Sequence, residues 1–199
     1  MNLANKLTIF RMILVPILVI VPYLYIQGEL LGIPLEYIIL DLIFIIASIT
    51  DKLDGYIARK KNQITTFGKF LDPIADKLLV ISALILFVEQ GKLPAWIPII
   101  VLIREFLVSG YRLVAVEKNG NVVAANIWGK LKTVTQMIAI IVMFIDKYSF
   151  IEFTHTNMQI PNLVINCLGS IMMIISVIAT IFSGWQYIKN GKDVLLNDV

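Results

Sequence analysis

The sequence predicts an all-α membrane protein, a bundle of six transmembrane helices with both termini in the cytoplasm. Of its 199 residues, 58% are apolar and 16% are charged, whereas a soluble domain is roughly half apolar and about a quarter charged. The apolar residues form six long runs, and a bilayer core of about 30 Å needs ~20 such residues per helix. Lys and Arg gather at alternate ends of these runs, as the positive-inside rule requires.

The predicted helices are separated by short segments that contain Gly, Pro or Asn, which favour turns. Little of the chain remains for a soluble domain, so residues 1–199 are interpreted as a single transmembrane domain. Because the connections are short, we expect consecutive helices to be antiparallel neighbours in one bundle. The predicted helices cover residues 8–27, 35–58, 71–89, 94–116, 128–146 and 161–188.

Each predicted boundary has its own turn residues. In chain order these are Gly28, Gly32 and Pro34 before the second helix, Gly68 before the third, Gly91 and Pro94 before the fourth, Asn119, Gly120 and Asn121 before the fifth, and Pro161 before the sixth.

The distribution of basic residues predicts the orientation. Eleven Lys and Arg residues flank one set of helix ends, against two, Lys92 and Lys147, at the other. Cytoplasmic flanks carry the excess, so we expect a multi-pass protein of the cell membrane with the segment Asp51–Asp76 at the cytoplasmic face. The net charge of +3 needs no nucleic-acid partner, because inner-flank lysines near anionic membrane lipids account for it.

Four aspartates lie close together at this inner face. Asp51 and Asp54 are three residues apart near the end of the second predicted helix, and Asp72 and Asp76 are four apart near the start of the third. Residues at these spacings share a helix face. A carboxylate in a membrane span costs roughly 2.5–3.5 kcal/mol and therefore suggests function. Joined by the loop of residues 59–70, the two helices would bring both pairs to the same depth.

Four neighbouring carboxylates repel one another and cannot all stay ionised without cations. Oxygen ligands without Cys or His favour Mg²⁺ or Mn²⁺, and bridging carboxylates suit two ions about 3.5–4 Å apart. Such a pair can hold a diphosphate. The alternative is that the acids form salt bridges with Lys52, Lys69 and Lys77, which leaves the small residues between them unexplained.

Those intervening residues suit a bound nucleotide diphosphate. Gly55 and Ala58 leave room for a ribose or base beside the helix backbone, and Arg59 offers a fork for phosphate oxygens. Gly68 lies where the loop must turn. Pro73 fits the first turn of the third helix, whose N-terminus would then face the phosphate.

The segment 51–77 reads DKLDGYIARKKNQITTFGKFLDPIADK, with the pattern DxxDGxxAR, eight residues, then GxxxDxxxD. This resembles the signature of the CDP-alcohol phosphatidyltransferase family, and the resemblance extends to the six-helix count. It implies that Asp51, Asp54, Asp72 and Asp76 ligate two metal ions, that Asp76 is the general base, and that a homodimer forms. It also implies that the CDP-lipid site is lined by Gly55, Ala58, Arg59 and Gly68, and by Asn5 and Thr8 in the segment NKLTIFR.

The acceptor is suggested by basic residues further along. Arg104 and Arg112 are eight residues apart and lie on roughly the same helix face, and Lys130 and Lys132 begin the fifth predicted helix. Together they could bind an acceptor that carries a phosphate. The segments REFLVSGYR and WGKLKTVTQ resemble those of family members whose acceptor is glycerol 3-phosphate. The alternative is an Arg104–Glu105 pair plus ordinary inner-flank lysines.

We therefore expect an enzyme of anionic phospholipid synthesis that transfers the phosphatidyl group of CDP-diacylglycerol to glycerol 3-phosphate, giving phosphatidylglycerophosphate and CMP. Three alternatives remain open. A sibling transferase would use inositol phosphate or serine, a divalent-cation transporter would use the acids as a permeation path, and a lipid-binding protein would catalyse nothing.

Overall fold

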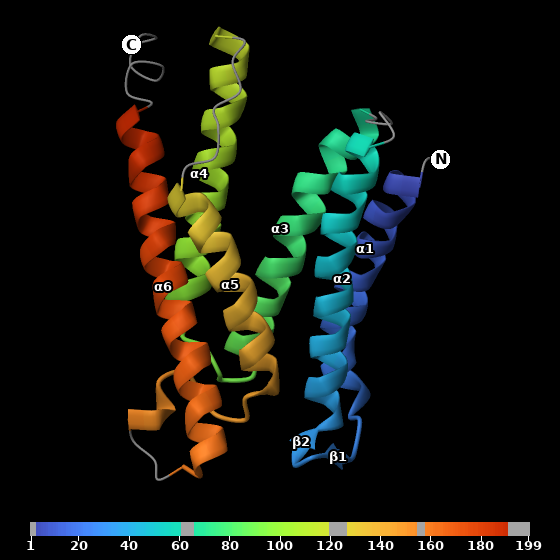
Figure 1. Cartoon of the computed structure of the whole chain (residues 1–199), viewed down its shortest axis with the longest axis vertical. Coiled ribbons are helices and arrows are strands. Elements are labelled where there is room, and N and C mark those ends of the chain that lie inside the picture. The colour runs from blue at the N-terminus through green and yellow to red at the C-terminus, as the bar shows by residue number, and fades with distance from the viewer. Residues whose placement is uncertain (1–2, 61–65, 120–126, 155–157, 191–199) are drawn as a thin grey trace.

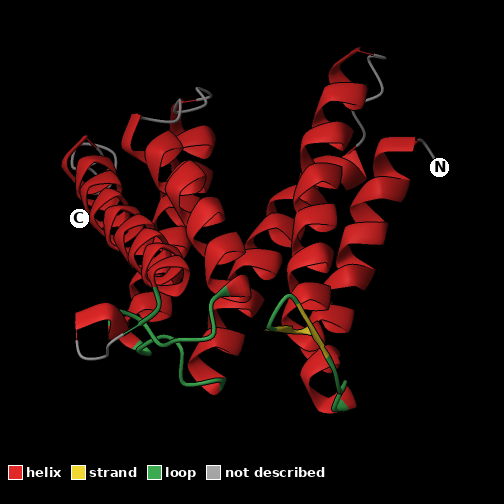
Figure 2. Cartoon of the chain, turned by 60° about the horizontal axis from the view of Figure 1, so that its bottom comes forward, coloured by secondary structure: helices red, strands yellow, loops and turns green. Residues whose placement is uncertain are grey.

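The computed structural model describes residues 3–60, 66–119, 127–154 and 158–190 and confirms an all-α fold (Figures 1 and 2). The described part contains six long α-helices, together with two short 3₁₀-helices and a two-stranded hairpin. The long helices are α1 (Leu3–Ile20), α2 (Leu35–Lys60), α3 (Thr66–Glu89), α4 (Trp96–Asn119), α5 (Ile127–Ile145) and α6 (Ile160–Asn190). The 3₁₀-helices are η1 (Val21–Leu24) and η2 (Glu152–Thr154), and the antiparallel strands are β1 (Glu29–Leu30) and β2 (Ile33–Pro34).

The helices form two groups, which Figure 1 shows side by side: α1, α2 and α3 in one, and α4, α5 and α6 in the other. The most extensive packing is between α5 and α6, and α1 packs on both α2 and α3. Contacts between α2 and α5 join the groups. The expectation that consecutive helices are neighbours is wrong in part, because α4 packs mainly against α6. Short connections limit where a helix can lie but do not decide which partner buries its apolar face.

The helix ends fall at two opposite ends of the molecule. Helix α1 begins, and α6 ends, at the end of the molecule where α2 passes into α3 (Figure 1). Lys92 and Lys147 follow α3 and α5, at the opposite end with β1 and β2. Among the described residues, three helical segments are long and apolar enough to cross a membrane, namely Asn5–Leu24, Ile127–Ile145 and Ile160–Lys189. The protein is therefore a membrane protein.

Aromatic packing fixes the centre of the bundle. The ring of Phe144 on α5 lies 4.6 Å from that of Phe87 on α3 and 5.9 Å from that of Phe44 on α2, measured between centroids. All three side chains are fully buried, and such tilted pairs add to the stabilisation from burial. Large apolar side chains such as Phe106 and Trp185 point outward and are about two-thirds exposed, at 68% and 66%. An apolar exterior of this kind suits a lipid surrounding.

The predicted start of the third helix is wrong, and the second helix ends slightly later than predicted. Helix α2 continues to Lys60 and α3 already begins at Thr66, so the connection is residues 61–65 rather than 59–70. Pro73 consequently lies inside α3 and not in its first turn, and the helix N-terminus does not begin beside it. A glycine such as Gly68 costs only about 1 kcal/mol in a helix, and the packing of a long helix can outweigh that cost.

A buried polar network joins the helices at the end opposite the acids. Lys92, only 3% exposed, donates from Nζ to the carbonyl oxygens of Met143, at 3.2 Å, and of Asp146. The same ammonium lies 3.6 Å from the ring centroid of Tyr37. The Asp146 carboxylate accepts a hydrogen bond of 2.7 Å from the Asn166 side chain. Lys92 thus caps the C-terminal end of α5, where the helix dipole favours a cation.

Lys92→Met is expected to destabilise the protein at pH 7 and to flatten the pH dependence of its stability. The substitution removes charge-assisted hydrogen bonds to the α5 carbonyls, which are worth about 1.5–3 kcal/mol. Burial lowers the pKa of Lys92 from 10.5 to about 8. Between these values the unfolded chain holds a proton that the folded protein has lost, so the free energy of unfolding rises with pH.

Thermal unfolding in detergent between pH 7 and pH 10.5 measures both effects. The exposed neighbour Lys147 provides the control substitution Lys147→Met. A Lys92→Met protein whose Tm still rises with pH as steeply as that of the unaltered chain would contradict the assignment.

Candidate active site

Helix α1 supplies partners for the acids of α2 and α3. Arg11 Nη1 lies 2.6 Å from Asp51 Oδ1, with the arginine fully buried and the aspartate side chain 38% exposed. Thr8, one turn earlier on the same face of α1, donates from Oγ1 to Asp72 Oδ1 at 2.7 Å. Asp76 interacts electrostatically with both Asp51 and Arg11. Three of the four predicted acids therefore belong to one site between α1, α2 and α3.

Arg11 is a site residue whose importance the sequence only suggested. It occurs in the segment NKLTIFR, but there it reads equally well as an inner-flank base. The signal was its position three residues after Thr8, which places both on one helix face. A buried arginine is stable only with an anionic partner, and Asp51 is that partner.

The donor chemistry of this site fits hard divalent cations. The ligands available are carboxylate oxygens, which suit Mg²⁺ or Mn²⁺. Asp51 and Asp76 repel each other, and Arg11 is close to both, so one cation already offsets part of the negative charge. Among the described side chains, no three acids gather closely enough to form a complete metal site. Asp54 is outside that set, because its side chain is not among those described.

The remaining residues predicted for the CDP-lipid are placed only in part. Asn5 lies half-buried on α1, one turn before Thr8. Gly55, Ala58 and Arg59 belong to α2 and Gly68 to α3. Only the helix is described at these four positions, and the predicted contacts of their side chains lie outside what the structure describes.

Glu105 joins two of the predicted acceptor-site bases. Its Oε1 lies 2.8 Å from Arg104 Nη1 and 2.8 Å from Lys132 Nζ. Arg104 also donates from Nη2 to the Ser183 hydroxyl on α6, at 2.7 Å. The structure thus contains the Arg104–Glu105 pair that the sequence left open as an alternative, and it extends the pair to Lys132.

Arg112 lies on the face of α4 that Arg104 occupies, as predicted, because both contact α6. Its Nη2 donates to the Tyr187 hydroxyl at 2.8 Å, and its guanidinium carbon lies 5.5 Å from the centroid of that ring. Ser183 and Tyr187 are one turn apart, a rise of ~6 Å, whereas the two arginines are separated by a rise of ~12 Å on α4. The side chains therefore converge on α6.

The Nε groups of Arg104 and Arg112 are buried and have no hydrogen-bond partner among the described residues. Each can still donate to an incoming phosphate oxygen. The two predicted lysines differ: Lys132 is buried, while Lys130 is exposed near the beginning of α5. Residues two apart on a helix do not face the same direction, so Lys130 is not brought into the Glu105 cluster.

A small cavity connects the acids with the bases. Asp76 of α3, Glu105 of α4 and Lys132 of α5 line it together. Beside it, Lys77 donates to the Ser109 hydroxyl, and that hydroxyl donates to the backbone oxygen of Glu105 at 2.6 Å. The carboxylate predicted to be the base therefore lies next to the residues predicted to hold the acceptor.

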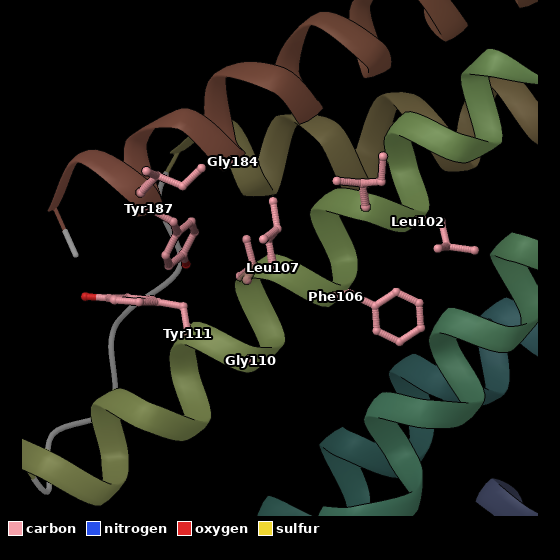
Figure 3. A pocket seen from close by; sticks show the side chains of 10 residues that line it. Leu102, Phe106, Leu107, Gly110, Tyr111, Gly184 and Tyr187 are labelled. Atoms are coloured by element: carbon pink, nitrogen blue, oxygen red, sulfur yellow. The ribbon is translucent and has the colours of Figure 1, made fainter. Parts of the chain in front are cut away.

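An apolar groove of about 510 Å³ runs between α4 and α6 beside this cluster. Figure 3 shows Leu102, Phe106 and Leu107 along its α4 wall. Tyr111 and Tyr187 lie at the end near Arg112 (Figure 3). The basic residues thus adjoin a surface that suits hydrocarbon.

The family is decided by sequence comparison. The family model described as CDP-alcohol phosphatidyltransferase matches residues 1–183. The chain belongs to this family. The resemblance seen in the acid-rich signature is thereby confirmed, and the site between α1, α2 and α3 contains three of the four aspartates of that signature.

Curated relatives of this transferase match it over nearly the whole chain. A protein of Bacillus subtilis is 41% identical over 98% of this chain and 97% of its own length. One of Haemophilus influenzae is 38% identical over 100% and 97%, and one of Salmonella choleraesuis is 34% identical over 98% and 98%. All three are named CDP-diacylglycerol–glycerol-3-phosphate 3-phosphatidyltransferase.

Thr8→Val is expected to lower the specific activity of the transferase about two- to tenfold. The substitution removes the hydrogen bond to Asp72 with little change of shape, and such a bond contributes about 0.5–1.5 kcal/mol net. CMP release under saturating substrates measures the effect. Thr8→Ser, which keeps the hydroxyl, should retain most of the activity, and a valine variant as active as the serine variant would contradict the role.

Proposed function

We propose that this transferase moves the phosphatidyl group of CDP-diacylglycerol to glycerol 3-phosphate, releasing CMP and forming phosphatidylglycerophosphate for anionic phospholipid synthesis. The observation that carries the proposal is the meeting of acids and bases at one cavity, where Asp76 lies beside Glu105 and Lys132. The shared name of the relatives from three bacteria supports the same acceptor.

The site is proposed to lie at the cytoplasmic face of the cell membrane, in a protein that crosses the bilayer six times with both termini inside. The excess of Lys and Arg at one set of helix ends supports this orientation. The apolar exterior of the bundle supports the spans. Family resemblance further supports a homodimer, which the molar mass of the detergent-solubilised protein would test.

Asp51, Asp54, Asp72 and Asp76 are proposed to hold two divalent ions, Mg²⁺ or Mn²⁺. When bound, the ions would offset the negative charge of the diphosphate and of the departing phosphate. Arg11 and Thr8 position Asp51 and Asp72 for this task through the contacts from α1. We propose that the cytidine diphosphate is bound by Asn5, Thr8, Gly55, Ala58, Arg59 and Gly68.

The phosphate of glycerol 3-phosphate is proposed to bind among Arg104, Arg112 and Lys132, without the exposed Lys130. The buried Nε groups of the two arginines, which have no partner in the described part of the chain, support this assignment. Asp76 accepts the proton of the 1-hydroxyl as that oxygen attacks the β-phosphorus, and the bond to the oxygen of CMP breaks. A carboxylate is a weak base for an alcohol, so proton transfer accompanies attack rather than preceding it.

An acceptor screen tests the proposal. Purified protein with CDP-diacylglycerol and Mg²⁺ should incorporate labelled glycerol 3-phosphate into lipid, and CMP release should require both the metal and the acceptor. Efficient incorporation of inositol phosphate or serine instead would identify a sibling transferase. Metal flux into proteoliposomes without CDP-lipid would favour the transporter.

A further inference from the structure

Glu105 is an acid that contacts two bases, Arg104 and Lys132, and the sequence did not assign it to the site. Its side chain is only 14% exposed, and one oxygen, Oε1, accepts from both Arg104 and Lys132. The two cations connect Glu105 to different helices: Arg104 also reaches α6 through Ser183, and Lys132 belongs to α5. Glu105 is thus fixed between two helices besides its own.

Lys132 faces a second carboxylate, that of Asp76. The two residues line the same cavity with Glu105 and attract each other electrostatically. The hydrogen bond of the ammonium nevertheless goes to Glu105, at 2.8 Å. In a poorly solvated site, an ammonium bonded to Asp76 would neutralise the charge of that carboxylate. It would also compete with a metal ion for the carboxylate oxygens.

The backbone around Glu105 is held in register with Asp76. Lys77, the residue after Asp76, donates to the Ser109 hydroxyl, which in turn donates to the Glu105 carbonyl oxygen. This chain links α3 to α4 one turn from the Glu105 side chain. The distance between the two competing carboxylates is therefore set by the fold and not by the lysine.

We propose that Glu105 is a positioning residue that holds the Lys132 ammonium away from Asp76, and so keeps Asp76 available to a divalent cation and to the acceptor hydroxyl. The inference rests on the proposed role of Asp76. Lys132 has two carboxylate neighbours, and it forms its hydrogen bond with Glu105 rather than with Asp76.

Mn²⁺ binding without substrates tests the proposal, measured by the loss of the free-ion electron paramagnetic resonance signal. Glu105→Gln is expected to weaken Mn²⁺ binding about tenfold, the effect of a modest electrostatic change, because Lys132 then pairs with Asp76. Adding Lys132→Met should restore the affinity to within about threefold of the unaltered protein. Glu89→Gln, the same change at the far end of α3, should bind Mn²⁺ normally.

A second double variant separates position from net charge. Glu105→Gln with Arg104→Met has the same net charge as the Lys132 combination but leaves the ammonium beside Asp76, so it should bind Mn²⁺ as weakly as Glu105→Gln alone. Equal rescue by both double variants would overturn the proposal, and so would unchanged affinity in Glu105→Gln. If Glu105→Gln does not fold, Glu105→Asp replaces it, with a smaller loss that Lys132→Met again reverses.

The transfer assay on the unaltered protein keeps the two proposals apart. No transfer to glycerol 3-phosphate would count against the proposed function. Normal transfer combined with an unchanged Mn²⁺ titration in Glu105→Gln would count against the role of Glu105 alone.

Discussion

Asp76→Asn is expected to lower kcat by at least ~10²–10⁴-fold, the contribution typical of a positioned general base. The amide cannot accept the proton of the attacking hydroxyl and is a poorer metal ligand than a carboxylate. The fold should persist, because Asn has nearly the same size and the change removes the repulsion between Asp76 and Asp51. Labelled glycerol 3-phosphate in detergent micelles measures the loss of turnover.

Asp41→Asn is the matched control for this change. Asp41 is a buried acid, 7% exposed, on the same helix as Asp51 but almost three turns from it. Its variant should keep activity within about twofold, since no hydrogen bond or ion pair joins it to the described residues of the proposed machinery. Near-normal turnover in Asp76→Asn itself would remove Asp76 from the role of base.

Arg112→Ala is expected to raise the KM for glycerol 3-phosphate about ten- to a hundredfold and to change the KM for CDP-diacylglycerol much less. A charge-assisted hydrogen bond contributes about 1.5–3 kcal/mol, which corresponds to that range. The buried Nε of Arg112, without a partner among the described residues, is the donor that the substitution removes. Initial rates at varied concentrations of each substrate separate the two constants.

Tyr187→Phe tests whether the arginine acts through its own charge. The substitution removes the hydroxyl that accepts from Arg112 Nη2 but keeps the ring that lies against the guanidinium. Only a small increase in the acceptor KM is expected. A larger effect of Arg112→Ala on CDP-diacylglycerol than on glycerol 3-phosphate would overturn the assignment of the pocket.

The helices were largely predictable because a bilayer imposes a length on each apolar run. The second helix, predicted as 35–58, is Leu35–Lys60, and the fifth, predicted as 128–146, is Ile127–Ile145. The third was predicted to begin five residues too late, at 71 instead of Thr66. Turn residues mark where a chain can bend, but long-range packing decides whether it does.

The site was predictable where its acidic residues recur at a helical spacing. The spacing of Asp72 and Asp76 indicates a shared face, and the signature indicates the family. Arg11 and Glu105 are different, because their importance arises from contacts between helices distant in sequence, with Asp51 and with Lys132. A single sequence contains no record of such pairing, and each residue has an ordinary interpretation as a flank charge or local pair.

The pairing of Arg11 with Asp51 has a consequence for membrane insertion during synthesis. The first helix leaves the ribosome before the second, so the guanidinium is already present in the membrane when the carboxylate arrives. A charged group that enters a bilayer beside an opposite charge avoids part of the cost of losing its water. We therefore expect Arg11 to lower the cost of inserting α2, so that Arg11→Met reduces the yield of correctly inserted protein in addition to any loss of activity.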